Sequence, residues 1–292
     1  LKVGKAKYSM ITAEDGGIID DLITYRFQED KFLVVPKAGN ADTVWDELNK
    51  RAESFDVTLK NESRDVAMIA VQGPKAAEIL VPLVEDNKQD EVYNLGYYAA
   101  TMGKVARTFA IIARTGYTGE DGFELIVYNS DAAQLWEELL KAGAEYDLKP
   151  CGLAARDSLR LEAGMPLYGN ELSRDITPVE AGMARAFAKK EADFVGSEVV
   201  RQRAAEGPQV AITGLTSEQR RAARAGAEVF VGDEKVGTVT SGQPSPTLGH
   251  PVAIALLNTG ANLEPGSAVE VEIRGKRYPF EVTALPFYKR DK

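Results

Sequence analysis

The fold is decided by a glycine turn that runs directly into a strand with two adjacent carboxylates: Gly16-Gly17-Ile18-Ile19-Asp20-Asp21-Leu22-Ile23-Thr24-Tyr25. Side chains alternate between the two faces of a strand, so Asp21 shares a face with Ile23 and Tyr25. An ionised carboxylate among apolar side chains is costly unless it is paired or hydrogen-bonded. Asp21 is therefore the leading candidate for a functional residue. Asp20 falls on the opposite face of the strand.

The composition is that of a globular protein with no preference for nucleic acid. A chain of 292 residues, of which 44% are hydrophobic and 27% charged, can form two or three units with separate cores. The 35 basic and 44 acidic residues give a formal charge of −9, which disfavours binding to phosphate backbones and anionic membranes. No apolar run approaches the roughly 18 residues that a membrane-spanning helix needs, and no signal-peptide core opens the chain, so we expect a cytoplasmic protein.

Cysteine and histidine are too scarce for several common chemistries. Cys151 is the only cysteine and His250 the only histidine, which excludes an internal disulfide and removes the usual ligands of zinc and the usual base of a catalytic triad. We expect no metal, a buried Cys151 and an exposed His250 without a role. The chemistry must then rely on carboxylates, Tyr, Arg, Lys or a cosubstrate.

Periodic apolar patterns predict alternating strands and helices up to about residue 190. The strands are expected at 6–11, 18–27, 31–35, 57–59, 66–71 and 123–128, with a hairpin-like pair over 102–114. The helices are expected at 40–55, 75–83, 131–146 and 152–163. In these helices we expect Phe55, Trp136 and Leu153 to pack inward, and Gly164 to end the last one.

A domain boundary is expected near residues 189–208, where the composition shifts. From Val210 onward, short strands separated by turn signals predict a small antiparallel barrel. The chain opens on Leu1 only a few residues before a strand pattern at Tyr8, so we expect that a neighbouring strand is missing from the N-terminus.

The densest cluster of glycines and polar residues spans residues 114–124 and reads Arg-Thr-Gly-Tyr-Thr-Gly-Glu-Asp-Gly-Phe-Glu. It lacks the Lys-Ser/Thr of a P-loop and the Gly-x-Gly-x-x-Gly of a dinucleotide site, so we reject both. A glycine-rich hairpin turn with Tyr117 packed against it is the ordinary interpretation. Phe123 and Glu124 alternate directly after the loop, so one of them must face protein.

The segment 152–164 predicts a helix with charges on more than one face. As an isolated surface helix it would pair Asp157 with Arg160, a contact worth roughly 0.3 kcal/mol. An arginine near the helix start, Arg156, could instead reach a carboxylate of a ligand. Residues 238–246 read as a strand end followed by a loop.

Taken together, these stretches resemble the aminomethyltransferase family of the glycine cleavage system, the T-proteins. The resemblance rests on the order and spacing of Tyr8 with 16–22, 114–124, 152–164, Tyr-Gly-Asn-Glu at 168–171, Thr-Pro-Val-Glu at 177–180, 237–246 and Pro-Phe-Tyr at 286–288. It covers essentially the whole chain. Family members usually carry several dozen more residues before the counterpart of Tyr8, and often a Trp near the position of Phe187.

The resemblance implies transfer of a methylene carbon from an aminomethyl group on the lipoyl arm of H-protein to tetrahydrofolate, which gives 5,10-methylenetetrahydrofolate and ammonia. It places Asp21 at the N10 region of the folate, where the carboxylate orients the folate and promotes attack. It leaves Asp20 with a solvent-facing or structural role. It also implies a set of folate-contacting residues, with Glu124 at the pterin edge and Arg290 at the glutamate tail: Tyr8, Tyr117, Glu124, Arg156, Phe187 and Arg290.

The fold that the resemblance implies is α+β. Two interleaved, ferredoxin-like or mixed-sheet folate-binding units would occupy residues 1–190, truncated at the N-terminus, and a small antiparallel β-barrel residues 208–292. Two alternatives stay open: a folate-dependent relative that acts as a demethylase or in tRNA modification, and a non-catalytic folate-binding remnant. The demethylase-type glycine-cysteine signature is missing, and Asp21 is present.

Overall fold

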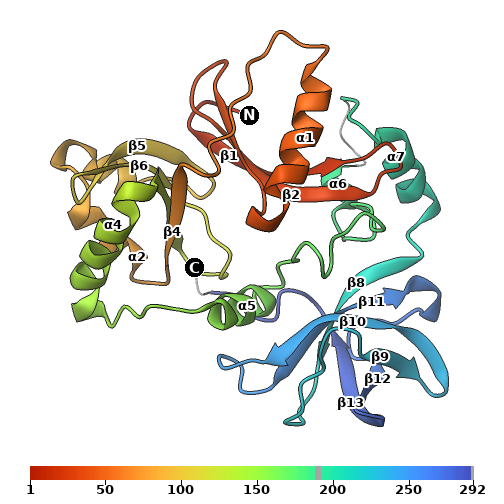
Figure 1. Cartoon of the computed structure of the whole chain (residues 1–292). Coiled ribbons are helices and arrows are strands. Elements are labelled where there is room, and N and C mark those ends of the chain that lie inside the picture. The colour runs from red at the N-terminus through yellow and green to blue at the C-terminus, as the bar shows by residue number, and fades with distance from the viewer. Residues whose placement is uncertain (188–191, 291–292) are drawn as a thin grey trace. The chain divides into compact units, whose positions relative to one another are not determined.

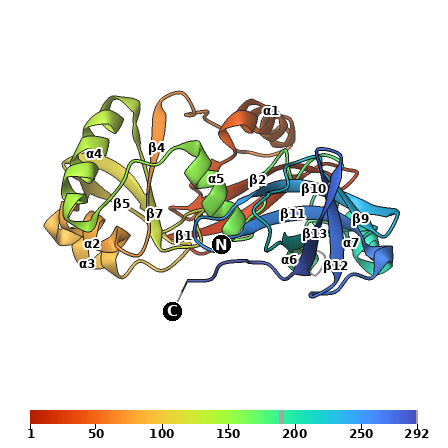
Figure 2. The same ribbon diagram turned by 90° about the horizontal axis from the view of Figure 1, so that it is seen from below.

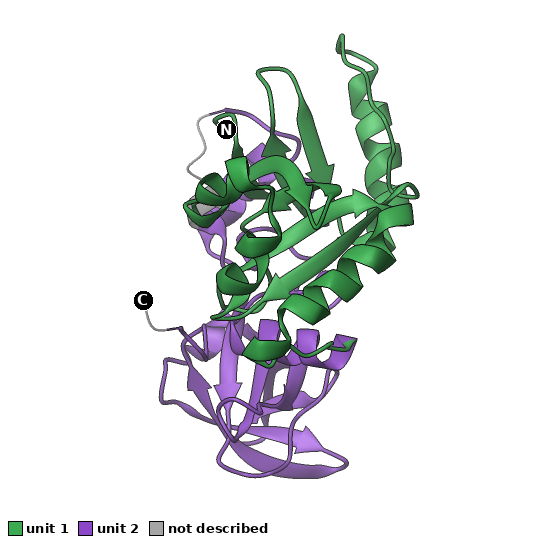
Figure 3. Cartoon of the chain, turned by 90° about the vertical axis from the view of Figure 1, so that its left-hand side faces the viewer, with its two compact units in different colours: residues 1–9, 22–152 green, residues 10–21, 153–292 purple. Residues whose placement is uncertain are grey.

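The computed structural model describes residues 1–187 and 192–290, which form two compact units that alternate along the chain (Figure 1, Figure 3). Unit 1 consists of residues 1–9 and 22–152, and unit 2 consists of residues 10–21 and the chain from Leu153 onward. The division between the units falls inside the first two strands of the protein. The chain is therefore α+β, with units that interleave in sequence.

The N-terminal sheet has three strands in the order β1-β2-β3, namely Lys5–Thr12, Ile18–Arg26 and Phe32–Val35. β2 and β3 pair antiparallel with Ile23 opposite Val35, which confirms the predicted hairpin. In the unit 1 part of the sheet, Tyr25 is fully buried and packs in a cluster with Ala6, Ala100 and Ala113.

The main body of unit 1 is a four-stranded antiparallel sheet in the order β4-β7-β6-β5. Its strands are Val66–Gln72, Ala100–Val105, Thr108–Ala113 and Gly122–Tyr128 for β4 to β7. The helices of the unit are α1 (Ala41–Ala52), α2 (Ala76–Leu80), α3 (Gln89–Tyr93) and α4 (Asn129–Ala142), with 3-10 helices at Ala38–Asn40, Val81–Leu83, Asp86–Lys88 and Ala144–Tyr146. α2 and α4 lie beside this sheet (Figure 1, Figure 2). Their apolar side chains form one core with those of the sheet.

Three details of unit 1 differ from the sequence prediction. α1 ends at Ala52, so Phe55 lies beyond the helix and is 70% exposed. Residues 57–59 form no strand, because an alternating triplet without a neighbouring strand has no ladder to join, and Val57 is exposed. Trp136 faces solvent because the buried stripe of α4 runs through Leu135 and Leu139.

Unit 2 contains a closed antiparallel barrel, as predicted, with strand order β10-β11-β8-β13-β12-β9. Closure leaves no strand edge unpaired and surrounds a core of aliphatic side chains. The strands β8 to β13 are Val210–Thr216, Glu228–Val231, Glu234–Pro244, Pro251–Asn258, Ala268–Ile273 and Lys276–Thr283. The helices are α5 (Leu153–Glu162), α6 (Ala184–Phe187) and α7 (Ser197–Glu206), with a 3-10 helix at Thr259–Ala261.

α5 packs through the end of its sequence rather than through its start. Leu161 is fully buried against Val252 and Ile254 of the barrel strand β11, whereas Leu153 is 84% exposed, contrary to the prediction. Leu153 opens the first turn, which lies off the barrel. Gly164 follows with a φ of +66°, a conformation that glycine adopts without strain, and ends the helix as predicted.

Candidate functional site

The glycine turn at residues 16–17 is required by the close approach of another segment of unit 2. Gly16 has a φ of +79°, and a Cβ on Gly17 would lie 2.0 Å from the carbonyl oxygen of Arg174. The N–H of Ile18 then donates to the carbonyls of Ser173 and Ile176 at 3.1 and 3.0 Å. The turn therefore fixes where β2 begins, and with it the position of the carboxylates two and three residues later.

Both carboxylates of β2 are buried. Asp21 is 1% exposed, in line with its predicted position on an apolar face. Asp20 is 0% exposed, so the solvent-facing role is wrong: both faces of β2 are covered here, as the burial of Ile18 and Ile19 shows. Burial alone does not distinguish the two acids, and a test of either one needs the other as its control.

Tyr168 ties the start of β2 to the chain that follows α5. Its hydroxyl donates to the carbonyl of Ile18 at 3.2 Å, and its ring packs in a cluster with Ile18, Leu172 and Ile176. Tyr168 belongs to the Tyr-Gly-Asn-Glu stretch, so this motif contributes to the setting of Asp20 and Asp21 within unit 2.

Glu124 is the centre of a second polar group, which lies within unit 1. It stands on β7 opposite Ala70 and Ala113, and its side chain is half-buried, whereas Phe123 is fully buried. The Thr115 hydroxyl donates to Glu124 Oε2 at 2.5 Å. The Tyr25 hydroxyl lies 3.3 Å from Thr115 Oγ1, which makes a chain of three polar side chains that we call the Tyr25–Thr115–Glu124 chain.

The phenols beside Glu124 remain protonated at neutral pH. Burial raises the pKa of Tyr25 from 10.0 to about 12; the hydrogen bond with Thr115 opposes this rise, and the charge of Glu124 adds to it. Burial also raises the pKa of Tyr98, with further contributions from Tyr97 and Glu124. Tyr98 has a φ of +57°, which is uncommon for a bulky residue and typical of functional sites.

The glycine-rich loop is filled by a side chain of the protein itself. The amide nitrogen of Gln72 donates to the carbonyls of Thr115 and Phe123, each at 3.1 Å. A Cβ on Gly116 would lie 1.9 Å from the Gln72 side-chain oxygen, and one on Gly122 would lie 2.5 Å from the same side chain. These glycines make room for Gln72, which accounts for a glycine pattern that resembles a phosphate loop without being one.

An ion pair closes the same loop. The Arg114 guanidinium contacts Asp121 through two hydrogen bonds of 3.0 and 2.7 Å, and it also donates to the carbonyls of Tyr93 and Leu95. Tyr117 is half-buried in this loop, with the Lys37 ammonium 5.2 Å from its ring centre. The predicted hairpin turn with a packed Tyr117 matches this arrangement.

The predicted site residues divide between the two units. Unit 1 holds Tyr8 on β1, Tyr117 in the loop and Glu124 on β7, the last two on one hairpin. Unit 2 holds Asp21 together with three further residues. These are the exposed Arg156 on α5, the half-buried Phe187 on α6 and the exposed Arg290 near the C-terminus. The Phe187 ring packs edge-on against Phe194, with 6.2 Å between centres.

Sequence reasoning missed four side chains of the group around Glu124. They are Tyr25, Tyr98, Gln72 and Thr115. Tyr25 could have been found because it shares the strand face of Asp21, and Tyr98 because it belongs to a pair of adjacent tyrosines, Tyr97-Tyr98. Nothing in the sequence pointed to Gln72, because its role depends on two glycines more than 40 residues away. Thr115 was part of the quoted cluster, but its hydrogen bond to Glu124 requires the pairing of β6 with β7.

A second carboxylate network lies in unit 2. Arg160, expected on a surface helix, is 1% exposed, although its predicted pair with Asp157 is present at 2.7 Å. Its other nitrogens bind Glu171 Oε2 at 3.0 Å and Ser241 Oγ at 2.7 Å. Asn170 donates to the same Ser241 hydroxyl at 3.0 Å, so this network joins α5, the 165–172 segment and β10.

Two other expectations about side chains were wrong. Cys151 is exposed, since it precedes α5 in an open stretch of chain. His250 is half-buried, and its Nδ1 lies 3.0 Å from Thr216 Oγ1, because the turn folds back on β8. In the described ranges 1–187 and 192–290, no three His, Cys, Asp or Glu side chains are grouped to hold a metal ion. No helix in the same ranges combines the length and apolar character of a membrane span.

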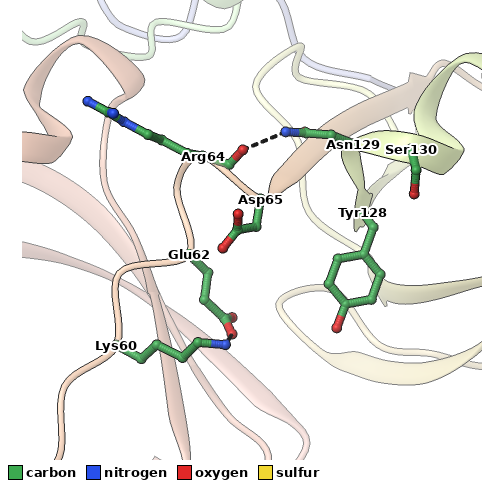
Figure 4. A pocket seen from close by; sticks show the side chains of 7 residues that line it. All are labelled: Lys60, Glu62, Arg64, Asp65, Tyr128, Asn129 and Ser130. Atoms are coloured by element: carbon green, nitrogen blue, oxygen red, sulfur yellow. Dashed lines mark hydrogen bonds and ion pairs between the residues drawn. The ribbon is translucent and has the colours of Figure 1, made fainter.

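A pocket of about 420 Å³ lies at the start of α4, apart from every predicted site residue (Figure 4). In it, Lys60 pairs with Glu62, and the Asn129 amide donates to the carbonyl of Arg64. Another, of about 620 Å³, lies near the end of α7 and the start of β8. Neither pocket is lined by Asp20, Asp21, Glu124 or Glu171.

Comparison with known families identifies the chain. A model described as the GCVT N-terminal domain matches residues 1–191, and one described as the glycine cleavage T-protein C-terminal barrel domain matches residues 211–289. The chain belongs to the glycine cleavage T-protein family. The family resemblance found in the sequence is therefore confirmed, and the role in glycine cleavage is that of an aminomethyltransferase.

Individual relatives agree with this assignment. The aminomethyltransferase of Corynebacterium aurimucosum is 83% identical over 292 residues, which cover 100% of this chain and 79% of that protein. The aminomethyltransferase of Corynebacterium jeikeium is 52% identical, with 100% and 80% covered. The crystal structure of the glycine cleavage system aminomethyltransferase T from Bartonella henselae matches with a TM-score of 0.87 at 36% identity, covering 99% of this chain and 77% of that one. The α+β fold with a C-terminal barrel is thus shared with the family.

Proposed function

We propose that this T-protein family member takes the methylene carbon from an aminomethyl group on the lipoyl arm of H-protein and transfers it to tetrahydrofolate, with release of ammonia. Family membership supports the reaction class. The observation that carries the assignment to residues is the burial of the Asp21 carboxylate on a strand that a glycine turn fixes in place. We also propose a cytoplasmic location, which rests on the sequence alone.

Glu124 has the chemistry that the pterin edge of a folate requires. That edge presents parallel N–H donors, and a carboxylate offers two oxygens with about four acceptor positions. Thr115 occupies one position on Oε2 of Glu124. The remaining acceptor capacity, on a half-buried side chain, fits charge-assisted hydrogen bonds from the pterin to Oε1.

The other predicted residues take roles that match their chemistry. Tetrahydrofolate supplies, when bound, the amine nitrogens that receive the methylene carbon. Asp21 holds and orients the N10 region through its carboxylate and moves a proton there. Tyr8, Tyr117 and Phe187 contribute aromatic surface to folate contact, while Arg156 and Arg290 offer guanidinium groups that suit carboxylates of the folate.

The direct test is ammonia release from aminomethyl-loaded H-protein and tetrahydrofolate, measured for the wild type, Asp21→Asn and the matched control Asp20→Asn. We expect Asp21→Asn to lower the rate by about 100-fold or more, the usual effect of losing an acid-base group. Full activity in Asp21→Asn would overturn the role of Asp21. A wild-type chain that binds folate but releases no ammonia would overturn the proposed transfer and leave a folate-binding protein.

A further inference from the structure

We propose that Thr115 and Tyr25 are positioning residues for Glu124: a one-way chain of hydroxyl donors that holds one carboxylate oxygen in place and presents the other to the ligand. This inference rests on the proposed function, since it takes Glu124 as the residue that meets the pterin. It adds a mechanism by which unit 1 controls the affinity for a folate.

The direction of the chain is fixed by chemistry. An ionised carboxylate only accepts hydrogen bonds, so the single hydroxyl proton of Thr115 must point to Glu124 Oε2, at 2.5 Å. Oγ1 of Thr115 can then only accept from Tyr25, whose hydroxyl is 3.3 Å away. The raised pKa of Tyr25 keeps that proton in place at neutral pH.

Burial makes this chain selective for one orientation of Glu124. Tyr25 is 0% and Thr115 1% exposed, so water does not compete for either hydroxyl. Glu124 itself is half-buried. Within residues 1–187 and 192–290, the bond from Thr115 is the only hydrogen bond to the Glu124 carboxylate. One end of the carboxylate is therefore held from inside the unit, and Oε1 remains an open acceptor.

The backbone beneath the Tyr25–Thr115–Glu124 chain is also held by hydrogen bonds. The Gln72 amide donates to the carbonyl of Thr115 and to that of Phe123, the residue before Glu124. Thr115 and Glu124 are thus tied to each other both through their side chains and through a shared backbone contact. The rotamer of the Glu124 carboxylate is therefore fixed before a ligand binds Oε1, and binding does not pay the entropy of ordering that side chain.

The experiment measures the affinity for 5-formyltetrahydrofolate by calorimetry, and the KM for tetrahydrofolate in the ammonia assay, with the full chain. Thr115→Val removes the hydroxyl at nearly constant shape, Thr115→Ser retains it, and Tyr25→Phe removes the outer donor. The matched control is Thr101→Val on strand β5, which removes another threonine hydroxyl that donates to a glutamate, in this case Glu91 of α3. Thermal unfolding checks that each variant is folded.

We expect Thr115→Val to weaken binding about tenfold, since it removes a hydrogen bond to a charged group, and Tyr25→Phe about threefold, since its hydrogen bond is to a neutral hydroxyl. KM should rise by the same factors with little change in kcat, Thr115→Ser should stay within about twofold of the wild type, and Thr101→Val should not differ from it. In a Glu124→Ala background, Thr115→Val should not weaken binding further, because the carboxylate that Thr115 positions is absent.

The outcomes separate the two proposals. Unchanged affinity in Glu124→Ala would remove Glu124 from the folate site and overturn the proposed role on which this inference rests. Weak binding by Glu124→Ala together with unchanged binding by folded Thr115→Val would overturn the positioning chain alone. Equal and additive losses in the wild-type and Glu124→Ala backgrounds would make Thr115 a purely structural residue, which also contradicts the inference.

Discussion

Two glutamate networks, one in each unit, differ in how completely the protein itself binds the carboxylate. Glu171 in unit 2 is 0% exposed and accepts hydrogen bonds at both oxygens: from Arg160 at 3.0 Å and the N–H of Leu167 at 2.9 Å on Oε2, and from Thr240 at 2.5 Å on Oε1. Glu124 in unit 1 is half-buried and receives its hydrogen bond from Thr115 alone among the described residues. The first carboxylate is saturated by the protein, and the second is left with acceptor capacity.

This difference predicts that breaking the Glu171 network lowers stability, whereas breaking the Glu124 network weakens ligand binding. A buried ion pair with satisfied hydrogen bonds becomes strongly destabilising only when one partner is removed. A carboxylate held at one oxygen contributes little to folding, and its open oxygen can meet a donor from a ligand. Glu171 thus serves the fold of unit 2, and Glu124 has the open acceptor oxygen that its proposed role in recognition requires.

The largest effect is expected from breaking the saturated network. Arg160→Met should lower the free energy of unfolding by about 3 to 5 kcal/mol, because it leaves the Glu171 charge buried without its cation. Urea unfolding measures this loss. Arg156→Met, on the exposed part of α5, is the control and should change stability by less than about 0.5 kcal/mol. A loss below 1 kcal/mol in Arg160→Met would remove the distinction between the networks.

The support beneath Glu124 can be broken at a glycine. Gly116→Ala brings a Cβ to within 1.9 Å of the Gln72 side-chain oxygen, so Gln72 must move and give up its contacts with two carbonyls. We expect a loss of about 1 to 3 kcal/mol in unfolding free energy and weaker folate binding. Gly152→Ala is the control, since a Cβ there meets nothing within 4 Å. An unchanged Gly116→Ala would show that Gln72 does not hold the loop.

The smallest effect is a pH dependence that belongs to the Glu124 network. Because the pKa of Tyr25 rises from 10.0 unfolded to about 12 folded, its contribution to stability is complete below pH 10 and is lost as the pH rises toward 12. Between pH 8 and pH 11, the wild type should lose about 1 kcal/mol more unfolding free energy than Tyr25→Phe. If the wild type and Tyr25→Phe lost the same unfolding free energy over this pH range, the raised pKa of Tyr25 would be contradicted.

The Glu171 network shows which features of the fold can be predicted from sequence and which cannot. Local periodicity and glycine placement predicted the barrel, the end of α5 at Gly164 and the strands of unit 1 apart from the one expected at 57–59, which does not form. The burial of Arg160 could not be predicted, since its partners Glu171 and Ser241 come from 11 and 81 residues away. A local pattern showed only its contact with Asp157.

The candidate site was predictable in part for the same reason. The burial of Asp21 was predictable, because a carboxylate on an apolar strand face can be recognised within ten residues of sequence. The full burial of Asp20 was not predicted, because alternation along one strand does not show that both of its faces are covered, as they are in β2. Tyr25 and Thr115 lie 90 residues apart, and their contact exists only because the later part of β2, from Leu22 onward, folds into the same unit as the β6–β7 hairpin.

The central claim is tested most directly by the affinity for 5-formyltetrahydrofolate of Glu124→Gln, measured beside its unfolding free energy. The difference between an open and a saturated carboxylate predicts at least about tenfold weaker binding with stability within about 0.5 kcal/mol of the wild type. Unchanged affinity, or a loss of stability as large as that of Arg160→Met, would contradict the account.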